Sequence, residues 1–348
     1  MNLSLSPEDA DFLAEVQQAL EPFADTRGFV VSNSTPELKA FYKALAARNW
    51  LALSWPVSAG GMGRSPVQEF LLWNEAHFRN IGRAPQGVGV VAKTIIRHGT
   101  EEQKAAWLDP IRRHDITFAL AYSEPNAGSD LGSLQCKAVL EGDRYLVTGN
   151  KCWNSKAHTV DYLWLLCRTG EASSGKKGLT LLIVDAKAPG VVIRPLELMC
   201  GNMVTEIFFD RAEVPVTHRI GPENGAWRLI TEALADERYV HFTPGRVRYD
   251  YFTLRRWLEE HGRLDDPSAR RRMDELAVLV LQAEAHVLRL LATPGDSSGI
   301  AASNKLAHVN AIQQIARAAI ALESIGGGTT EIMESIIARQ RLGLAANR

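Results

Sequence analysis

The sequence predicts an α+β fold in which a helical N-terminal domain is followed by a middle β-barrel-like domain and a helical C-terminal bundle. Two observations predict this order. Apolar residues recur at helical spacing near both ends of the chain, whereas short β-branched or apolar runs separated by glycines fill the middle. A chain of 348 residues suffices for two or three domains. We expect them to span residues 1–115, 116–222 and 223–348.

The N-terminal domain carries two clear helix starts. Ser6 precedes Pro7 and two acids, which is the pattern of an N-cap followed by a favourable first turn. Thr100 and Gln103 have the spacing of a capping box. Between these helices, the prolines and glycines of residues 55–63 predict a loop.

The middle segment reads as strands and the last third as helices. No helix-period segment interrupts the β runs, so a doubly wound parallel sheet is not expected. Helices are expected from about residue 227 onward, with long apolar patterns over 274–291 and 311–322. The expected strands cover residues 138–140, 144–148, 162–167, 179–184, 191–193 and 206–209.

Composition excludes several classes of function. The net charge is −1, so neither a nucleic-acid partner nor an anionic membrane surface is expected. The basic clusters at 255–256 and 270–272 are interpreted as solvated helix faces. No run approaches the roughly 20 apolar residues of a membrane span. The four cysteines lack metal-ligand spacing, which predicts no metal site and indicates a reducing, cytoplasmic compartment.

Two segments of the middle region could bind a ligand. Residues 121–130 form a Gly/Ser-rich loop with two acids at the expected switch from helix to strand, and small residues allow a ligand close to the backbone. An ordinary turn before a strand has the same composition. In residues 149–155, Trp153 could stack on a planar ring, although a Trp in a strand is usually a core residue.

Two further segments could carry chemistry. Glu237 lies among apolar residues, which would desolvate its carboxylate and raise its pKa toward that of a general base. A surface ion pair with Arg238 is the alternative. Three glycines at 326–328, before an amphipathic segment at 332–342, could form an oxygen-binding helix start or a flexible turn.

Taken in order, these segments resemble the acyl-CoA dehydrogenase family. Residues 123–130 (SEPNAGSD) are similar to the family's flavin loop, and residues 151–155 (KCWNS) to its strand motif with a central Trp. The resemblance extends to Trp55-Pro56 with the following glycines, to residues 98–104 (HGTEEQK) and to residues 221–225 (GPENG). It implies FAD as the cofactor and an acyl thioester, on CoA or on a carrier protein, as the substrate.

The resemblance also implies individual roles. Trp153 would pack on the isoalloxazine, Ser155 would approach its N5 side, and Ser129 would reach the pyrophosphate. The N–H of Gly327 would polarise the thioester carbonyl. Catalytic residues are expected to be Glu237 and Gly327, and substrate contacts Arg238 and Gly328. Flavin contacts are expected from Tyr122, Ser123, Gly128, Ser129, Trp153, Asn154, Ser155, Thr329 and Glu331.

The chain departs from the family pattern at its C-terminal end. Most members carry the catalytic Glu where this sequence has residues 326–329 (GGGT). Glu237-Arg238 matches the minority that places the base on the first helix of the C-terminal domain. This combination is most similar to the short dehydrogenases of actinobacterial sterol side-chain breakdown, some of which pair unlike subunits. Segments that usually hold the adenine half of FAD, including an Arg supplied to the partner subunit, have no clear counterpart; Arg246, Arg248, Arg255 and Arg256 are candidates.

The expected activity is α,β-desaturation of the acyl thioester. Glu237 would take the α-proton while hydride passes from the β-carbon to flavin N5, with Glu331 and Glu323 as the next candidate bases. A redox protein or oxygen would accept the electrons, and a homodimer, homotetramer or hetero-oligomer is expected. Two alternatives are a non-catalytic subunit of a hetero-oligomer and a flavin monooxygenase or oxidase on the same scaffold.

Overall fold

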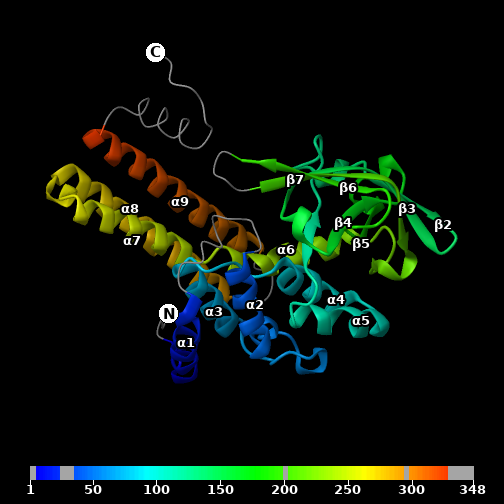
Figure 1. The fold of residues 1–348 in the computed structure, drawn as a ribbon, viewed down its shortest axis with the longest axis horizontal. Helices are drawn as coiled ribbons and strands as arrows, with labels where there is room; N and C mark the ends of the chain where they lie inside the picture. The colour runs from blue at the N-terminus through cyan, green and yellow to red at the C-terminus, as the bar shows by residue number, and fades with distance from the viewer. Residues whose placement is uncertain (1–4, 24–34, 199–202, 294–297, 328–348) are drawn as a thin grey trace, which may run out of the picture. The chain divides into compact units, whose positions relative to one another are not determined.

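A computed structural model of the chain describes residues 5–23, 35–198, 203–293 and 298–327 (Figure 1). The chain divides into two compact units. Unit one combines Met1–Asp25, Phe70–Ile81 and Arg238–Arg348, and unit two combines Thr26–Glu69 and Gly82–Glu237.

The described residues form helical segments at both ends of the chain and strands in the middle. The helices are α1 (Pro7–Leu20), α2 (Pro36–Ala47), α3 (Pro66–Phe78), α4 (Ala92–His98), α5 (Glu101–Arg112), α6 (Ala226–His241), α7 (Pro244–Glu260), α8 (Pro267–Leu291) and α9 (Ser298–Gly327). The strands are β1 (Phe118–Ala121), β2 (Lys137–Glu141), β3 (Arg144–Ser155), β4 (Tyr162–Arg168), β5 (Leu179–Asp185), β6 (Val191–Glu197), β7 (Met203–Pro215) and β8 (Arg219–Ile220).

Both expected helix starts are confirmed. Ser6 is the N-cap of α1, and Thr100 and Gln103 form a complete capping box at the start of α5. Gln103 also donates from Nε2 to the backbone oxygens of Thr217 and Arg219, each at 2.8 Å. Gln103, which completes the capping box of α5, therefore also connects this helix to the residues at and just before β8.

The strands of unit two form one sheet in the order β6-β7-β3-β2-β4-β5-β8, and β1 pairs in parallel with β4. Its buried face centres on Tyr145, Val147, Leu163, Leu165 and Ile207. Two short strands, β1 and β8, were not expected from the sequence, because runs of two to four residues carry too little period-2 signal. Their presence corrects one expectation: the loop at 121–130 follows a strand rather than a helix.

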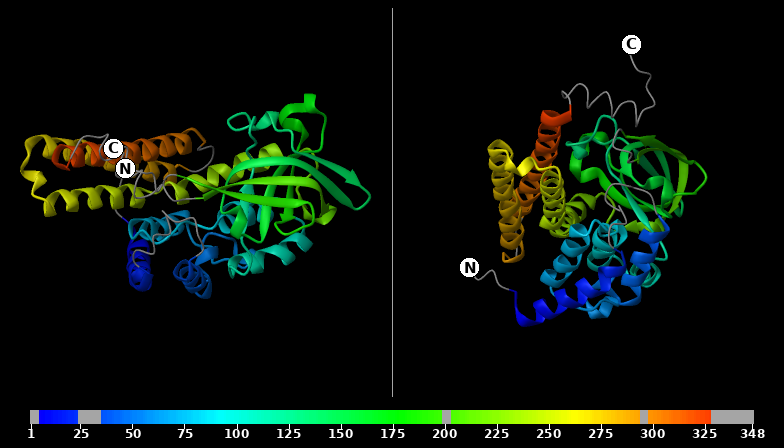
Figure 2. Two further views of the ribbon diagram at one scale, coloured as in Figure 1. Left: turned by 45° about the horizontal axis from the view of Figure 1, so that its top comes forward. Right: turned by 60° about the vertical axis from the view of Figure 1, so that its left-hand side comes forward.

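In unit one, α7, α8 and α9 lie side by side along much of their lengths (Figure 2). Their common core includes Leu258, Met273, Leu276 and Ile315. Helix α9 is far longer than the expected 311–322, because alanines at its start give a weak apolar period. The basic clusters are confirmed as largely solvated helix faces: Arg255, Arg256, Arg270 and Arg271 are exposed and Arg272 is half-buried.

Within the described ranges, none of the helices has the length and apolar character to cross a membrane. The same residues contain no group of three His, Cys, Asp or Glu side chains arranged to hold a metal ion.

Candidate active site

A buried ion pair joins the loop after β1 to the middle of β3. Lys151 is fully buried and donates from Nζ to Oε1 of Glu124 at 2.7 Å and to the backbone oxygen of Tyr122 at 3.0 Å. The carboxylate of Glu124 also accepts from the backbone N–H groups of Gln135, at 2.7 Å, and Cys136, at 2.8 Å. Both charges are therefore paired and hydrogen-bonded, which is the condition under which buried charges persist. The pair fixes the loop to the sheet.

Backbone and amide bonds extend this connection along β3. The N–H of Cys152 donates to the backbone oxygen of Ser123 at 2.9 Å, and Asn154 donates from Nδ2 to the backbone oxygen of Leu120 at 2.7 Å. Asn154 in turn accepts at its backbone oxygen from Thr205 Oγ1 at 2.9 Å. Ser123 consequently lies directly beside the strand segment that carries Trp153.

Trp153 projects from an irregularity in β3. The pairing of β3 with β7 shifts between Lys151 and Asn154, and Trp153 has φ of 63°. A left-handed backbone at a bulky residue is an outlier that usually marks a functional constraint. Bulges of this kind re-aim side chains. Here the indole is 65% exposed, and Ser155 beyond it is exposed too.

The tip of the loop is accessible. A tight turn closed by reciprocal backbone bonds between Glu124 and Ala127, at 2.9 and 3.1 Å, precedes Gly128. Gly128 and Ser129 are exposed, and a Cβ added at Gly128 would meet nothing within 4 Å. The chain itself therefore does not require a glycine there, whereas close approach of a ligand to the backbone would.

These features fit the flavin expected from the sequence. The exposed indole can cover one part of a planar ring. Hydroxyls are available from Ser123, in the loop beside β3, and from Ser155, at the end of that strand. Asn154 is 4% exposed, and its Oδ1 is buried without a hydrogen-bond partner among the described residues, so it can accept a bond from a ligand N–H. Gly128 and Ser129 leave an open backbone for phosphate oxygens.

The thiols beside this face are not nucleophiles. Burial raises the pKa of the Cys136 thiol to about 11, and burial likewise raises the pKa of Cys152. Both groups stay protonated near neutral pH, which removes the reactive thiolate. Cys136, Cys152 and Cys167 are buried and free, whereas Cys200 lies outside the described residues.

Helix α6, which carries Glu237, is anchored to unit two at its start and middle. Just before the helix, the N–H of Asn224 donates to Thr180 Oγ1 on β5 at 2.8 Å. Within it, Glu232 lies 2.7 Å from His98 Nε2, measured from Oε2. Unit two ends at Glu237, and the remaining turn of the helix belongs to unit one.

Position 237 lies on the apolar stripe of α6. Ala226, Ile230, Ala233 and Val240 are each at most 2% exposed. Their spacing of three and four residues defines one face of a helix, and position 237 is four residues after Ala233 and three before Val240. An acidic residue in the centre of such a stripe is unusual, because charged residues belong on the opposite face.

The remaining predicted residues are placed as follows. Gly327 is the last residue of α9, whereas the sequence suggested a turn before a helix. The backbone oxygen of Arg238 accepts from Asn304 on α9 at 3.2 Å. Gly328, Thr329, Glu331 and the helix expected at 332–342 lie outside the described residues.

The candidate arginines differ in their surroundings. Arg246 donates to Asn80 Oδ1 at 3.0 Å and pairs with Asp250 at 2.8 Å. Arg248 lies over the ring of Phe78, 4.8 Å from its centroid. Both are engaged inside unit one, which leaves Arg255 and Arg256 as the exposed candidates.

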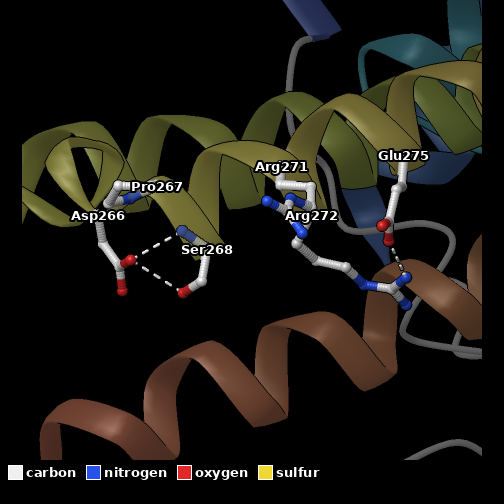
Figure 3. Close-up of a pocket in the computed structure, with 6 residues that line it drawn as sticks. All are labelled: Asp266, Pro267, Ser268, Arg271, Arg272 and Glu275. Carbon is white, nitrogen blue, oxygen red and sulfur yellow. Dashed lines mark hydrogen bonds and ion pairs between the residues drawn. The ribbon is translucent and has the colours of Figure 1, made fainter.

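Surface hollows lined by described residues of unit one include the following pair. One, of about 530 Å³, lies at the start of α8, where Asp266 accepts from Ser268 and Arg272 pairs with Glu275 (Figure 3). The other, of about 450 Å³, lies between α7 and α9 and is lined mainly by apolar side chains. Arg271, which also lines the first hollow, is exposed, whereas Asp266, Arg272 and Glu275 are used in the helix cap and the ion pair.

Glu124 and Lys151 are the site residues that the sequence analysis missed. Both lie inside the motifs that were singled out, yet only their neighbours were assigned roles. The available signal was Lys151 itself, because a lysine in a strand whose neighbours are buried requires a partner.

Comparisons with known proteins agree with this arrangement. The model of the acyl-CoA dehydrogenase N-terminal domain matches residues 10–115, and that of the acyl-CoA dehydrogenase middle domain matches residues 119–212. Acyl-CoA dehydrogenase FadE26 of Mycobacterium tuberculosis (strain ATCC 25618 / H37Rv) is 32% identical over 86% of each chain. Acyl-CoA dehydrogenase FadE29 of the same organism is 34% identical over 75% of this chain and 69% of its own.

Two solved structures share the fold over their full lengths. The Tcur3481-Tcur3483 steroid ACAD superposes with a TM-score of 0.84 at 26% identity, with 100% of both chains covered. The ChsE4-ChsE5 complex from Mycobacterium tuberculosis superposes with a TM-score of 0.79 at 27% identity, again with 100% of both chains covered. With helices at both ends, a middle β-sheet, and matching family models and relatives, the chain belongs to the acyl-CoA dehydrogenase family of FAD-dependent oxidoreductases.

Proposed function

We propose that this enzyme desaturates an acyl thioester between its α- and β-carbons, with Glu237 as the base that removes the α-proton. The observation that carries this proposal is the position of Glu237 on α6. It lies in the centre of a stripe whose other members are buried and apolar. A carboxylate at such a helix position suits a base that must act on a weak carbon acid.

The chain's own residues would divide the work between binding and proton transfer. Ser123, Trp153 and Ser155 would hold and orient the flavin ring, and Ser129 its pyrophosphate. Bound FAD would supply the acceptor for the hydride that leaves the β-carbon. Glu237 receives the α-proton, the two carbons form a double bond, and the thioester is released as the enoyl product.

The carbonyl of the thioester needs hydrogen-bond donors, because negative charge develops on it as the α-proton leaves. We assign this role to the backbone N–H of Gly327 and a substrate contact to Gly328. Gly327 ends α9, where N–H groups are bonded within the helix, so this assignment requires the last turn of α9 to open when the thioester binds. Arg238, next to Glu237, is assigned to the substrate. The absence of side chains at both glycines would leave room for a bulky acyl group. A relative whose title names it a steroid ACAD supports testing polycyclic acids.

A second candidate role is that of one half of a two-chain enzyme. Both structures that match over their full lengths carry titles naming two components, Tcur3481-Tcur3483 and ChsE4-ChsE5. The family segments that usually complete the adenine side of FAD have no clear counterpart in this sequence. A partner chain that supplies them would make FAD binding dependent on the complex.

The visible spectrum of the purified chain separates these roles. A yellow protein whose flavin is bleached anaerobically by a thioester, with a product lighter by two hydrogen atoms, supports the desaturase. Thioesters of short, branched and sterol-like acids, on CoA and on pantetheine carriers, identify the acyl group. A folded but colourless chain that turns yellow only with a partner supports the two-chain enzyme. A hydroxylated product formed with oxygen would overturn the desaturase assignment.

A further inference from the structure

The junction between α6 and α7 contains buried polar groups as well as buried apolar residues such as Val240 and Val247. Asn304, on α9, is completely buried and donates from Nδ2 to the backbone oxygens of Arg238 and Phe242, each at 3.2 Å. These carbonyls lie in and just after the last turn of α6, where helix geometry leaves oxygens without intrahelical partners. Asn304 therefore acts as a cap supplied from a different helix.

The other side of the junction is clamped by α3. Thr243 and His77 are both fully buried, and Thr243 Oγ1 lies 2.6 Å from His77 Nδ1. The N–H of Gly245 donates to Asn74 Oδ1 at 2.8 Å. A Cβ at Gly245 would overlap the backbone oxygen of Asn74, so the two backbones are in direct contact. The end of α6 and the start of α7 are thus fixed on both sides within unit one.

Burying the side-chain amide of Asn304 costs free energy that a purely structural residue would not require. Burying an amide requires that its polar atoms be bonded, and Oδ1 of Asn304 has no partner among the described residues. A side chain of similar size without polar atoms would avoid that cost but could not hold the two carbonyls. The free-energy cost falls on Asn304 itself. One of the two carbonyls that it bonds belongs to Arg238, the residue that follows Glu237.

We infer that Asn304 is a positioning residue for Glu237: its two hydrogen bonds fix the last turn of α6, the backbone that directly follows the base. The inference rests on the proposed function, because it requires Glu237 to be the base. Earlier contacts anchor α6 through Asn224 and Glu232. Asn304 bonds its last turn, next to contacts of the Phe242 ring with His308 and Lys305. Loss of this anchor would loosen the helix backbone next to Glu237, whereas the residues assigned to flavin binding keep their own contacts within unit two.

The test uses Asn304→Leu, which keeps the size and removes both donors, in the complete flavin-containing enzyme. The matched control is Ile315→Val, which loosens packing of the same helix without touching α6. Amide hydrogen exchange of residues 236–242 is measured in both variants, along with the limiting rate of flavin bleaching and the thioester concentration for half-saturation. Asn304→Ser, which retains one donor, replaces Asn304→Leu if the latter does not fold.

The inference predicts faster exchange at residues 236–242 in Asn304→Leu and a limiting bleaching rate roughly 10- to 100-fold lower, as for a misplaced catalytic group. The half-saturating concentration and the flavin spectrum should stay unchanged, and Ile315→Val should behave like wild type. Faster exchange with an unchanged limiting rate would overturn the inference and make Asn304 a structural cap. Glu237→Gln is run in parallel: if it bleaches at the wild-type rate, the proposed function fails first, and Asn304 loses the base it was assigned to position.

Discussion

Lys151 Nζ lies 2.7 Å from Oε1 of Glu124, and the lysine side chain is completely buried. Removing one member of a buried pair leaves an unpaired charge, which typically costs about 3–5 kcal/mol. We therefore expect Lys151→Met to lower the free energy of unfolding by about that amount, as measured by urea denaturation of the flavin-free protein. FAD should be lost as well, because the loop carrying Ser123 would no longer be held against β3.

Two comparisons make the Lys151 prediction specific. Lys137→Met, at an exposed position of β2, should change the free energy of unfolding by no more than about 0.5 kcal/mol. The double variant Lys151→Met/Glu124→Leu removes both charges and should recover part of the lost stability. Equal stability of Lys151→Met and wild type would show that the pair does not hold the loop.

Trp153 should matter for FAD and not for folding. Its indole is 65% exposed and its backbone has φ of 63°, so Trp153→Gly removes little packing and relieves strain. The unfolding free energy of the flavin-free protein should stay the same or rise. The dissociation constant of FAD, measured by fluorescence titration, should rise by roughly 3- to 10-fold, because an aromatic contact contributes about 0.5–1.5 kcal/mol.

Val139→Ala, which truncates an exposed apolar side chain on β2, is the control for Trp153 and should leave FAD affinity unchanged. If Trp153→Gly bound FAD as tightly as wild type, the indole would not lie against the flavin.

His114 makes the stability of unit two dependent on pH. Burial, helped by nearby Lys43, lowers the pKa of His114 from 6.5 to about 4. The unfolded chain thus takes up a proton at His114 below about pH 6.5 while the folded chain does not. Unfolding becomes more favourable as pH falls from about 6.5 to about 4, by up to about 3 kcal/mol. Above pH 6.5 this contribution is constant.

The check for His114 is the free energy of unfolding measured at several pH values in wild type and His114→Asn. Asparagine tolerates the left-handed backbone at this position, where φ is 54°. The variant should lose the part of the pH dependence that lies between about pH 4 and 6.5. Identical pH profiles for the two proteins would exclude His114 as its source.

Gly245 is required by backbone contact. A Cβ there would overlap the backbone oxygen of Asn74, which cannot move without shifting α3. Gly245→Ala should therefore lower the free energy of unfolding by roughly 1–3 kcal/mol. Gly299→Ala, where an added Cβ meets nothing within 4 Å, should be neutral or stabilising by about 0.4–1 kcal/mol. If the two variants had the same stability, the predicted overlap at Gly245 would be wrong.

The order of helices and strands could be predicted because it depends on local period. The capping box at Thr100 and Gln103 is encoded by neighbouring residues. The irregularity at Trp153 was not predicted, because it is a shift in the pairing of β3 with the distant strand β7. The pairing of Glu124 with Lys151 could not be predicted in this way, since it joins residues 27 positions apart through the fold. Asn304 was missed for the same reason: its partners, the backbone oxygens of Arg238 in α6 and of Phe242 just after it, lie 66 and 62 positions away in the sequence.

The end of α9 shows a different limit. The glycines at 326 and 327 suggested a turn, because glycine disfavours helix interiors by about 1 kcal/mol relative to alanine. The long helix that begins at Ser298 instead continues through them to Gly327. The packing of α9 against α7 and α8, through residues such as Ala311 and Ile315, outweighs this local preference.

The central claim, that Glu237 removes the α-proton, is tested most directly by Glu237→Gln in a stopped-flow measurement of flavin bleaching at saturating thioester. Glutamine keeps the size and position of the side chain but cannot accept the proton. We predict that the variant retains FAD and binds the thioester, while its bleaching rate falls by at least about 10²-fold, as expected when a general base is removed. Bleaching at the wild-type rate would contradict the account and direct the search for the base to Glu331 and Glu323.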